Sequence, residues 1–193
     1  PPPPAPSATL AALVAEAERI GVGTRSAAEF AEAARRWHAL RARLATVDRA
    51  ALDRDDRVDA ELLDAHARTR LFELETVRLH TVVPVQWLDL PRTNALFVRD
   101  DALGDAGLRA AAAELRAVPT VLAHARAQLA VPARVWTENA IAQAPYARLM
   151  LDDDVPRVRA SAPGLRDSLL AAAGVAREAL DRHARWMRDT LLP

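Results

Sequence analysis

The sequence contains no cysteine and no lysine, and each absence narrows what the protein can be. Without cysteine the fold has no disulfide bonds, and the sequence carries no sign of the redox compartment. All 26 residues counted as lysine plus arginine are arginine, and 26 aspartate and glutamate residues balance them. The chain therefore has no basic surplus that would attract nucleic acid and no acidic tail.

Long apolar runs are also missing. No stretch approaches the roughly 18 consecutive apolar residues that span a bilayer, and no signal peptide is visible. We therefore expect no membrane span and no nucleic-acid partner. The chain starts with PPPPAPS instead of methionine, which fits removal of an export signal as well as a cloned boundary. Cytoplasmic and exported locations both stay open.

What remains is typical of a globular helical protein. Hydrophobic residues make up 51% of the 193 positions and charged residues 27%, while glycine occupies only 6. The length is sufficient for a sizeable core. We expect residues 1–6 to form a disordered proline-rich lead-in and residues 7–193 to form a single helical domain.

Apolar residues of the first half recur at intervals of three and four, which is the helical period. Ser7 is the candidate N-cap of a first helix, and Ser26 with Glu29 forms a capping box for a second. A third helix follows an acidic start at 53–59 and has the strongest periodicity. Its predicted core stripe is Val58, Leu62, Ala65, Thr69, Phe72, Thr76 and Leu79.

The segment 81–101 breaks this rhythm. It contains two prolines and a mixed apolar run, which predict an irregular and partly buried connection. The valines between residues 82 and 85 leave a pair of strands open as the alternative.

Further helices are predicted in the second half. Asp105 begins a helix that kinks or splits at Pro119. Thr137 caps the next helix, and Ser161 caps the last and longest one, which runs towards Leu191. The stripe of this last helix is Leu165, Leu169, Ala172, Ala176, Leu180, His183, Met187 and Leu191. Together the stripes predict an all-α fold, an antiparallel array of about six to eight helices in which the long C-terminal helix spans the domain.

The residues present do not assemble an active site. The five histidines stand apart, and none precedes a glutamate as in zinc peptidase motifs. Two aspartate groups, at 53–59 and 152–154, lack the central glycine and terminal glutamate of a calcium loop, and helix N-termini explain them better. We therefore predict no catalytic, metal-binding or cofactor-binding residue in this chain.

Five segments carry a resemblance to a known family. They are DRDDRVDAELL (53–63), ARTRLFELETVR (67–78), ELRAVPTVLAHARAQL (114–129), PARVWTENAIAQ (132–143) and the closing LLAAAGVAREALDRHARWMRDTLLP. From residue 52 to its end, the chain resembles the N-terminal half of the bacterial domain-of-unknown-function 885 family. The first 50 residues match this family only loosely.

The resemblance implies an activity for a longer protein. The family is similar to zinc metallopeptidases and is mostly helical, with a His-Glu motif followed by Pro-Gly-His in its later half. The first His and the Glu of that motif would serve as metal ligand and general base. That half is absent here, so the resemblance implies zinc only in the missing C-terminal half. The segment 82–90 also departs from the family pattern of Asn-Pro followed by aromatics, which implies a different specificity if it lines the substrate cleft.

Two functions of different class follow from these observations. The chain is either the helical front domain of a metallopeptidase-like hydrolase, forming one wall of its substrate cleft, or a stand-alone helical interaction module without a catalytic role. Its partner is then the missing catalytic half or a second copy of itself. The residues predicted to line the cleft are Trp136, Thr137, Glu138 and Trp87. Helix capping by Glu138 and a core position for Trp136 stay open as alternatives.

Overall fold

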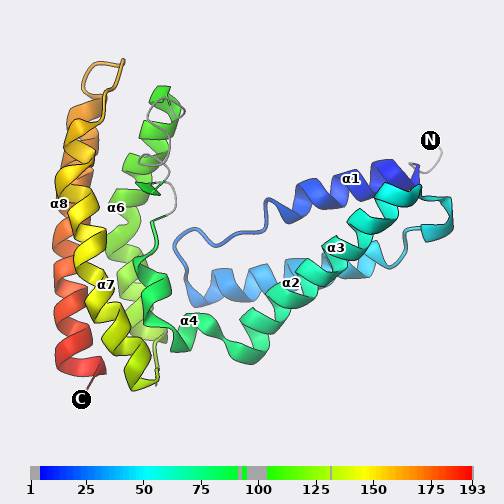
Figure 1. The fold of residues 1–193 in the computed structure, drawn as a ribbon, viewed down its shortest axis with the longest axis horizontal. Helices are drawn as coiled ribbons and strands as arrows, with labels where there is room; N and C mark the ends of the chain where they lie inside the picture. The colour runs from blue at the N-terminus through cyan, green and yellow to red at the C-terminus, as the bar shows by residue number, and fades with distance from the viewer. Residues whose placement is uncertain (1–4, 91–92, 95–103, 131, 193) are drawn as a thin grey trace. The chain divides into compact units, whose positions relative to one another are not determined.

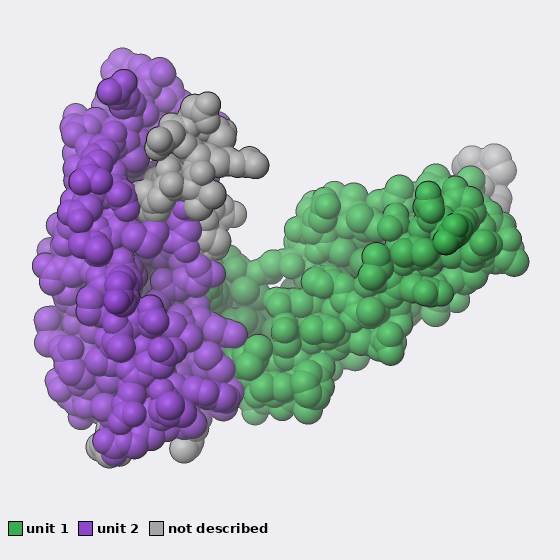
Figure 2. All heavy atoms as spheres, in the orientation of Figure 1, with its two compact units in different colours: residues 1–79 green, residues 80–193 purple. Residues whose placement is uncertain are grey.

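The computed structural model describes residues 5–90, 93–94, 104–130 and 132–192. These residues form helices and turns without any strand, which confirms the predicted all-α fold (Figure 1). They gather into two compact units, Pro1–Leu79 and His80–Pro193, which we call unit 1 and unit 2 (Figure 2). The single domain predicted over residues 7–193 stays a prediction.

Capping residues explain two helix starts in unit 1. Its elements are α1 (Pro6–Ala17), α2 (Ala27–Leu44), the 3-10 turn η1 (Arg49–Ala51), α3 (Arg54–Leu71) and the π-helical turn η2 (Phe72–Val77). The N–H of Glu29 donates to Ser26 Oγ at 3.2 Å, and the N–H of Ser26 donates to Glu29 Oε2 at 2.9 Å, which confirms the capping box. At the start of α3, Asp53 accepts a hydrogen bond from the N–H of Asp56 at 2.8 Å.

The predicted cap at Ser7 is wrong. The first helix begins one residue earlier, at Pro6, and Ala5 precedes it without a side-chain hydrogen bond. Proline suits the first helical position because its missing N–H would have no partner inside the helix there. Pro6 therefore belongs to α1, and residues 1–4 of the predicted lead-in lie outside the described residues.

One cluster of buried side chains forms the core of unit 1. Its members come from α1, α2, α3 and the connection between α2 and α3; they are Leu10, Leu13, Ala34, Trp37, Leu40, Leu44, Val47, Leu52, Ala60, Leu63, Ala67 and Leu71. Leucine dominates this cluster. Trp37 adds the largest single side chain, and large apolar groups of this kind supply most of the burial energy of a small helical unit.

The predicted core stripe of α3 is wrong. Val58, Leu62 and Phe72 are 49%, 62% and 55% exposed. A stripe on the opposite side of the helix, which includes Ala60 and Ala67, faces the core instead, because its small alanines let α1 and α2 approach α3 closely. The spacing of three and four identified the helix correctly and its buried side incorrectly.

Unit 2 is built on three long helices. Its elements are α4 (Leu79–Val82, which begins at the last residue of unit 1), η3 (Pro84–Leu88), α6 (Gly104–Gln128), α7 (Arg134–Asp153), η4 (Val155–Arg157), α8 (Leu165–Trp186) and η5 (Met187–Leu191). The long helices α6, α7 and α8 lie side by side, and α7 runs opposite to the other two (Figure 1). The connection forms a helical turn at η3, so the strand alternative is wrong over residues 82–88.

Three details of the predicted helices in unit 2 need correction. The helix α6 is continuous through Pro119, so the alternative of two separate helices is wrong. Thr137 and Ser161 are not caps: α7 begins three residues before Thr137, and α8 begins at Leu165. Gly164 precedes α8 with a φ of 70°, a conformation that glycine adopts without steric cost.

The predicted stripe of the last helix is confirmed over most of its length. Its buried members are Leu165, Leu169, Ala172, Ala176, Leu180, His183 and Met187. Opposite them, α6 buries Leu108, Ala111, Ala112, Leu115, Val118, Leu122 and Ala125. Alanines on both helices allow close approach of the two axes. Among the described helices, none combines the length and the apolar character needed to cross a bilayer.

Candidate functional site

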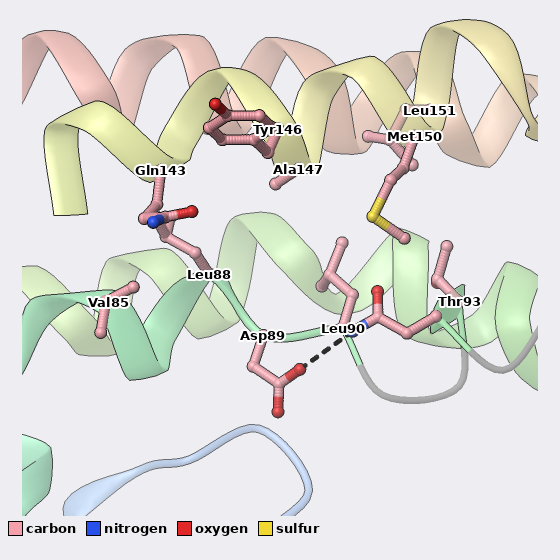
Figure 3. Close-up of a pocket in the computed structure, with 11 residues that line it drawn as sticks. Val85, Leu88, Asp89, Leu90, Thr93, Gln143, Tyr146, Ala147, Met150 and Leu151 are labelled. Carbon is pink, nitrogen blue, oxygen red and sulfur yellow. Dashed lines mark hydrogen bonds between the residues drawn. The ribbon is translucent and has the colours of Figure 1, made fainter. Parts of the chain in front are cut away.

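A pocket of about 230 Å³ opens in unit 2 between α7 and the segment that starts at η3 (Figure 3). Its walls are mostly apolar, with a few amide, hydroxyl and carboxylate groups among them. The lining residues are Val85, Leu88, Asp89, Leu90, Thr93, Asn94, Gln143, Tyr146, Ala147, Met150 and Leu151. A concave apolar surface with a small number of polar groups is the usual form of a site for a small molecule or a peptide side chain.

The floor of this pocket is held by a tryptophan. Trp87 is buried, and its indole N–H donates to the carbonyl oxygen of His80 at 3.0 Å. Pro84 begins the turn, where its fixed φ and missing N–H suit the first helical position. Leu88, which follows the tryptophan, is buried as well. The sequence Pro-Val-Gln-Trp-Leu thus folds as a turn anchored from inside, and it presents its apolar side to α7.

The polar edge of the pocket is held from α6. Both the N–H and the hydroxyl of Thr93 donate to Glu114 Oε2, at 2.8 and 2.9 Å. The side-chain amide of Asn94 donates to Asp89 Oδ1 at 3.2 Å (Figure 3). These bonds fix the backbone at one side of the opening. The side-chain amides of Asn94 and Gln143 are neutral hydrogen-bonding groups in the pocket lining.

The solvent-facing side of α7 is unusually apolar next to this pocket. Trp136 is 42% exposed and Tyr146 is 62% exposed, and Val135 and Leu149 are exposed as well. Val135, Tyr146 and Leu149 lie eleven and three residues apart, which places them on one face of the helix. A single exposed apolar residue needs no explanation, whereas several on one helix face are typical of a contact surface.

The structure places the four predicted cleft residues in two different environments. Trp136 and Glu138 reach solvent, and Glu138 pairs with Arg134 at 2.8 Å. Thr137 and Trp87 are buried. The core alternative for Trp136 is therefore wrong, and Glu138 bonds to a side chain of its own helix instead of to backbone amides at the N-terminus. None of the four lines the described pocket, and their role in a substrate cleft stays a prediction.

Sequence reasoning missed the residues that do line the pocket. Tyr146 is the single tyrosine of the chain, and it follows a proline inside a helix. A lone aromatic hydroxyl at that position is the one signal that the sequence offered. Asn94 and Gln143 meet only through the tertiary fold, because 48 residues separate them and neither stands in a recognisable motif.

One ionisable group of unit 2 is deeply buried. The ring of His183 on α8 packs 5.2 Å from the ring of Trp186, measured between centroids. Burial, and to a lesser degree the charge of Arg126, lowers the pKa of the His183 imidazole from 6.5 to about 4. The imidazole is therefore neutral at pH 7. Neither of its ring nitrogens has a hydrogen-bond partner within the described part of the chain.

Metal ligands are scattered in this chain. In residues 5–90, 93–94, 104–130 and 132–192, no three histidine or carboxylate side chains come together as a metal site requires. Asp53, from one of the aspartate groups, caps α3, as the sequence predicted. The predicted absence of metal and cofactor from this chain stays a prediction.

The fold and site therefore define an all-α protein with an apolar surface pocket in unit 2. Residues 9–193 match a family described as bacterial protein of unknown function, DUF885, and the chain belongs to that family. This confirms the predicted family membership and extends the match almost to the N-terminus, while the position in the N-terminal half of a metallopeptidase-like protein stays a prediction. No curated protein matches the chain.

A solved structure shares the fold. It is that of a protein from Shewanella oneidensis, described as a candidate lipoprotein of unknown function, with a TM-score of 0.86 and 15% sequence identity. The match covers 98% of this chain and 38% of the other, so this chain spans well under half the length of that protein. At this identity the likeness concerns the fold alone.

Proposed function

We propose that this chain is the helical front part of a metallopeptidase-like hydrolase and forms one wall of its substrate cleft. The observation that carries the proposal is the juxtaposition on α7 of an exposed apolar face and a pocket with two neutral amides. Such a surface suits a peptide better than a charged metabolite, because a peptide offers apolar side chains and uncharged backbone groups. Membership of DUF885 and the greater length of the Shewanella protein support a larger parent protein.

Each part of this wall has a distinct task in the proposal. The pocket accepts one apolar side chain of the substrate, and Leu88 and Met150 contact it. Asn94 and Gln143 exchange hydrogen bonds with the substrate backbone. Tyr146 packs on the peptide at the pocket, and Trp136 packs on it farther along α7, outside the pocket. Contacts of this kind hold a substrate in register with a reacting centre, and the rate depends on that positioning even when the contacts lie far from the chemistry.

Catalysis itself falls to the C-terminal half that the family resemblance implies. Zinc bound there would polarise the scissile carbonyl and activate water. The described residues of the present chain do not fit a zinc site, since no three ligand side chains are grouped among them. We assign no chemical step to them. The partner of this chain is therefore the catalytic half, covalently attached or packed against it.

The test uses the parent protein with a fluorogenic peptide library as substrate. Tyr146→Ala should lower kcat/KM about tenfold, and the melting temperature should stay within a degree or two, because the side chain is exposed. Val175→Ala is the matched control, since Val175 is an exposed apolar residue on α8. Equal hydrolysis by both variants would overturn the cleft assignment. Zinc measured per molecule should be near one for the parent and near zero for this chain alone.

A second function, a stand-alone interaction module without catalysis, is favoured by a different observation. Unit 1 has its own exposed apolar face on α3, although its core is complete without those residues. Under this alternative the coding region after Pro193 contains no His-Glu motif. A protein with that motif and with peptide hydrolysis would exclude the alternative.

A further inference from the structure

The most regular apolar pattern of the sequence faces solvent. We call Val58, Leu62, Ala65, Thr69 and Phe72 the outer α3 face. Its three large members are 49%, 62% and 55% exposed, and the two small ones between them are exposed as well. The core of unit 1 is filled from the opposite side of the helix. The outer α3 face therefore has no role in the interior of unit 1.

The spacing of the outer α3 face is that of a coiled-coil seam. Intervals of four, three, four and three residues place Leu62 and Thr69 at a positions, and Val58, Ala65 and Phe72 at d positions of a heptad. The hydroxyl of Thr69 donates to the carbonyl oxygen of Ala65 at 3.1 Å, so it presents its methyl group to a partner without a polar group to satisfy. The seam is roughly 21 Å long, from the helical rise of 1.5 Å per residue.

The surface relief around the seam suits a helix. Leu62 borders two hollows, of about 360 and 450 Å³. The first lies towards α1 and includes Val14, Glu18 and Asp59. The second lies towards η1 and includes Arg49. A ridge between two grooves is the surface into which a neighbouring helix interdigitates.

The charges at the edges of the seam identify the partner. In a parallel pair of helices, a g residue of one helix meets the e residue five positions later on the other. Three such pairs form between the g residue of one copy and the e residue of the other: Arg54 with Asp59, Glu61 with His66, and Arg68 with Glu73. We call each such pair a rung: two rungs join an arginine with a carboxylate, and the third joins Glu61 with His66. A second copy of this chain, aligned in parallel, therefore has no rung with two like charges.

The antiparallel orientation is less favourable in each of two alignments. In that orientation g meets g and e meets e, so aligning Leu62 with Phe72 of the partner subunit brings Asp59 towards Glu73 of the partner subunit. Like charges across such edges oppose association. Aligning Leu62 with the partner's Ala65 instead pairs Glu61 with Arg68 of the partner subunit, but it places Phe72 opposite Asp55 of the partner subunit. The parallel alignment combines complementary edges with apolar contacts along the whole seam.

The existing ion pairs do not block the parallel arrangement. Arg68 pairs with Asp64 at 3.1 Å, and Glu73 pairs with Arg70, both within a helical turn on the surface. Such exposed pairs are weak and exchange partners readily. Arg54 and Asp59 have no ion pair in the described part of the chain, and Glu18 lies beside Asp59 in the first hollow. In the parallel dimer, Arg54 of one copy therefore lies near two carboxylates of the other, those of Asp59 and Glu18.

We infer that the chain forms a parallel homodimer through the outer α3 face. The interface is isologous, so each rung occurs twice. Because the seam covers only about two heptads and contains Ala65 and Thr69, the dimer should dissociate on dilution. The inference does not rest on the proposed function, which concerns unit 2.

The first test is sedimentation equilibrium of the full chain over a concentration series. Leu62→Asp should abolish dimerisation and leave the melting temperature of the monomer, measured at high dilution, unchanged. Val175→Asp, a change at another exposed apolar residue on α8, should leave the dimer intact. Arg54→Glu and Asp59→Arg should each weaken the dimer about tenfold, and the double variant should return to within a few fold of the parent. A monomer up to millimolar concentration would overturn the inference, and so would a double variant no tighter than the singles.

The second test reads the orientation directly. The parent chain contains no cysteine, so one introduced thiol gives an unambiguous answer. Ala65→Cys should form an intermolecular disulfide under mild oxidation, because in a parallel seam position 65 faces position 65. Ala171→Cys on the exposed side of α8 is the control and should stay monomeric. If the Ala65→Cys variant still dimerises but forms no cross-link, the parallel seam is excluded. Peptidase activity in the parent protein is unaffected by either outcome.

Discussion

Unit 1 and unit 2 reach a stable core by different means. Unit 1 fills its interior with leucines around one tryptophan, Trp37. Unit 2 brings α6 and α8 together along alanine-rich faces, and it buries the polar side chains of Thr137 and His183. Large apolar side chains tolerate neighbours at several distances, whereas alanine faces require close and regular contact. We therefore expect unit 2 to be the more sensitive to substitution and to pH.

The largest expected effect tests whether the two units unfold independently. Leu180→Asp places a carboxylate among the buried residues of α8, and Leu40→Asp does the same in unit 1. A buried unpaired charge costs about 4 kcal/mol or more, which exceeds much of the stability of a small domain. Each variant should lose hydrogen-exchange protection in its own unit. Loss of protection throughout the chain in either variant would instead make the two units one domain.

Replacing one buried tryptophan in each unit should lower the free energy of unfolding by a similar amount in both. Trp87→Ala should cost about 3–5 kcal/mol, because it leaves a cavity in the core behind the pocket and leaves the carbonyl of His80 without its indole donor. Trp37→Ala should cost a similar amount in unit 1. Urea unfolding measures both. Trp136→Ala is the matched control on the surface of α7 and should change the free energy of unfolding by less than about 1 kcal/mol.

Acid should destabilise unit 2 through His183. Its folded pKa of about 4 lies below the unfolded value of 6.5, so only the unfolded state takes up the proton between these pH values. The stabilisation from this neutral histidine is complete above about pH 6.5 and is lost as the pH falls towards 4, by about 3 kcal/mol at most. His183→Leu should remove this part of the pH dependence in urea unfolding at pH 7.5, 6 and 5. Parallel curves for both proteins would contradict the assignment.

The smallest effect concerns helix capping. Ser26→Ala removes the capping box of α2 and should lower the stability of unit 1 by about 1 kcal/mol. Ser161→Ala is the matched change in unit 2 and should be neutral, because the side chain of Ser161 does not cap α8. A midpoint shift in thermal unfolding for both variants would show that Ser161 contributes in a way that its geometry does not explain.

The comparison also explains what sequence could predict. The stripe of α8 was correct because Leu169, Ala172 and Leu180 are the apolar residues on one side of an otherwise polar helix. The stripe of α3 was wrong because that helix is apolar on two sides, and only the arrangement of α1 and α2 decides which side is covered. Periodicity measures amphipathicity and gives no information about the neighbours.

Local hydrogen bonds were predictable where the sequence pattern was complete. Ser26 with Glu29 satisfies both halves of the capping box, whereas Ser7, Thr137 and Ser161 offered only a hydroxyl before an apolar run. The pocket was not predictable, because Asn94 and Gln143 are brought together only when η3 packs on α7. The charges of α3 can be read from the sequence. They indicate a dimer interface only because the apolar seam beside them is exposed in the structure.

Glu114 has a consequence for how the pocket can change during evolution. This one carboxylate, on α6, accepts both hydrogen bonds from Thr93. The opposite wall consists of α7 side chains such as Tyr146 and Met150, which make no such bond to the frame. Substitutions on α7 can therefore accumulate and alter what the pocket accepts, while a change at Glu114 removes its edge. The α7 side chains that line the pocket and the carboxylate that holds its edge thus belong to different helices, so the first can change without loss of the second.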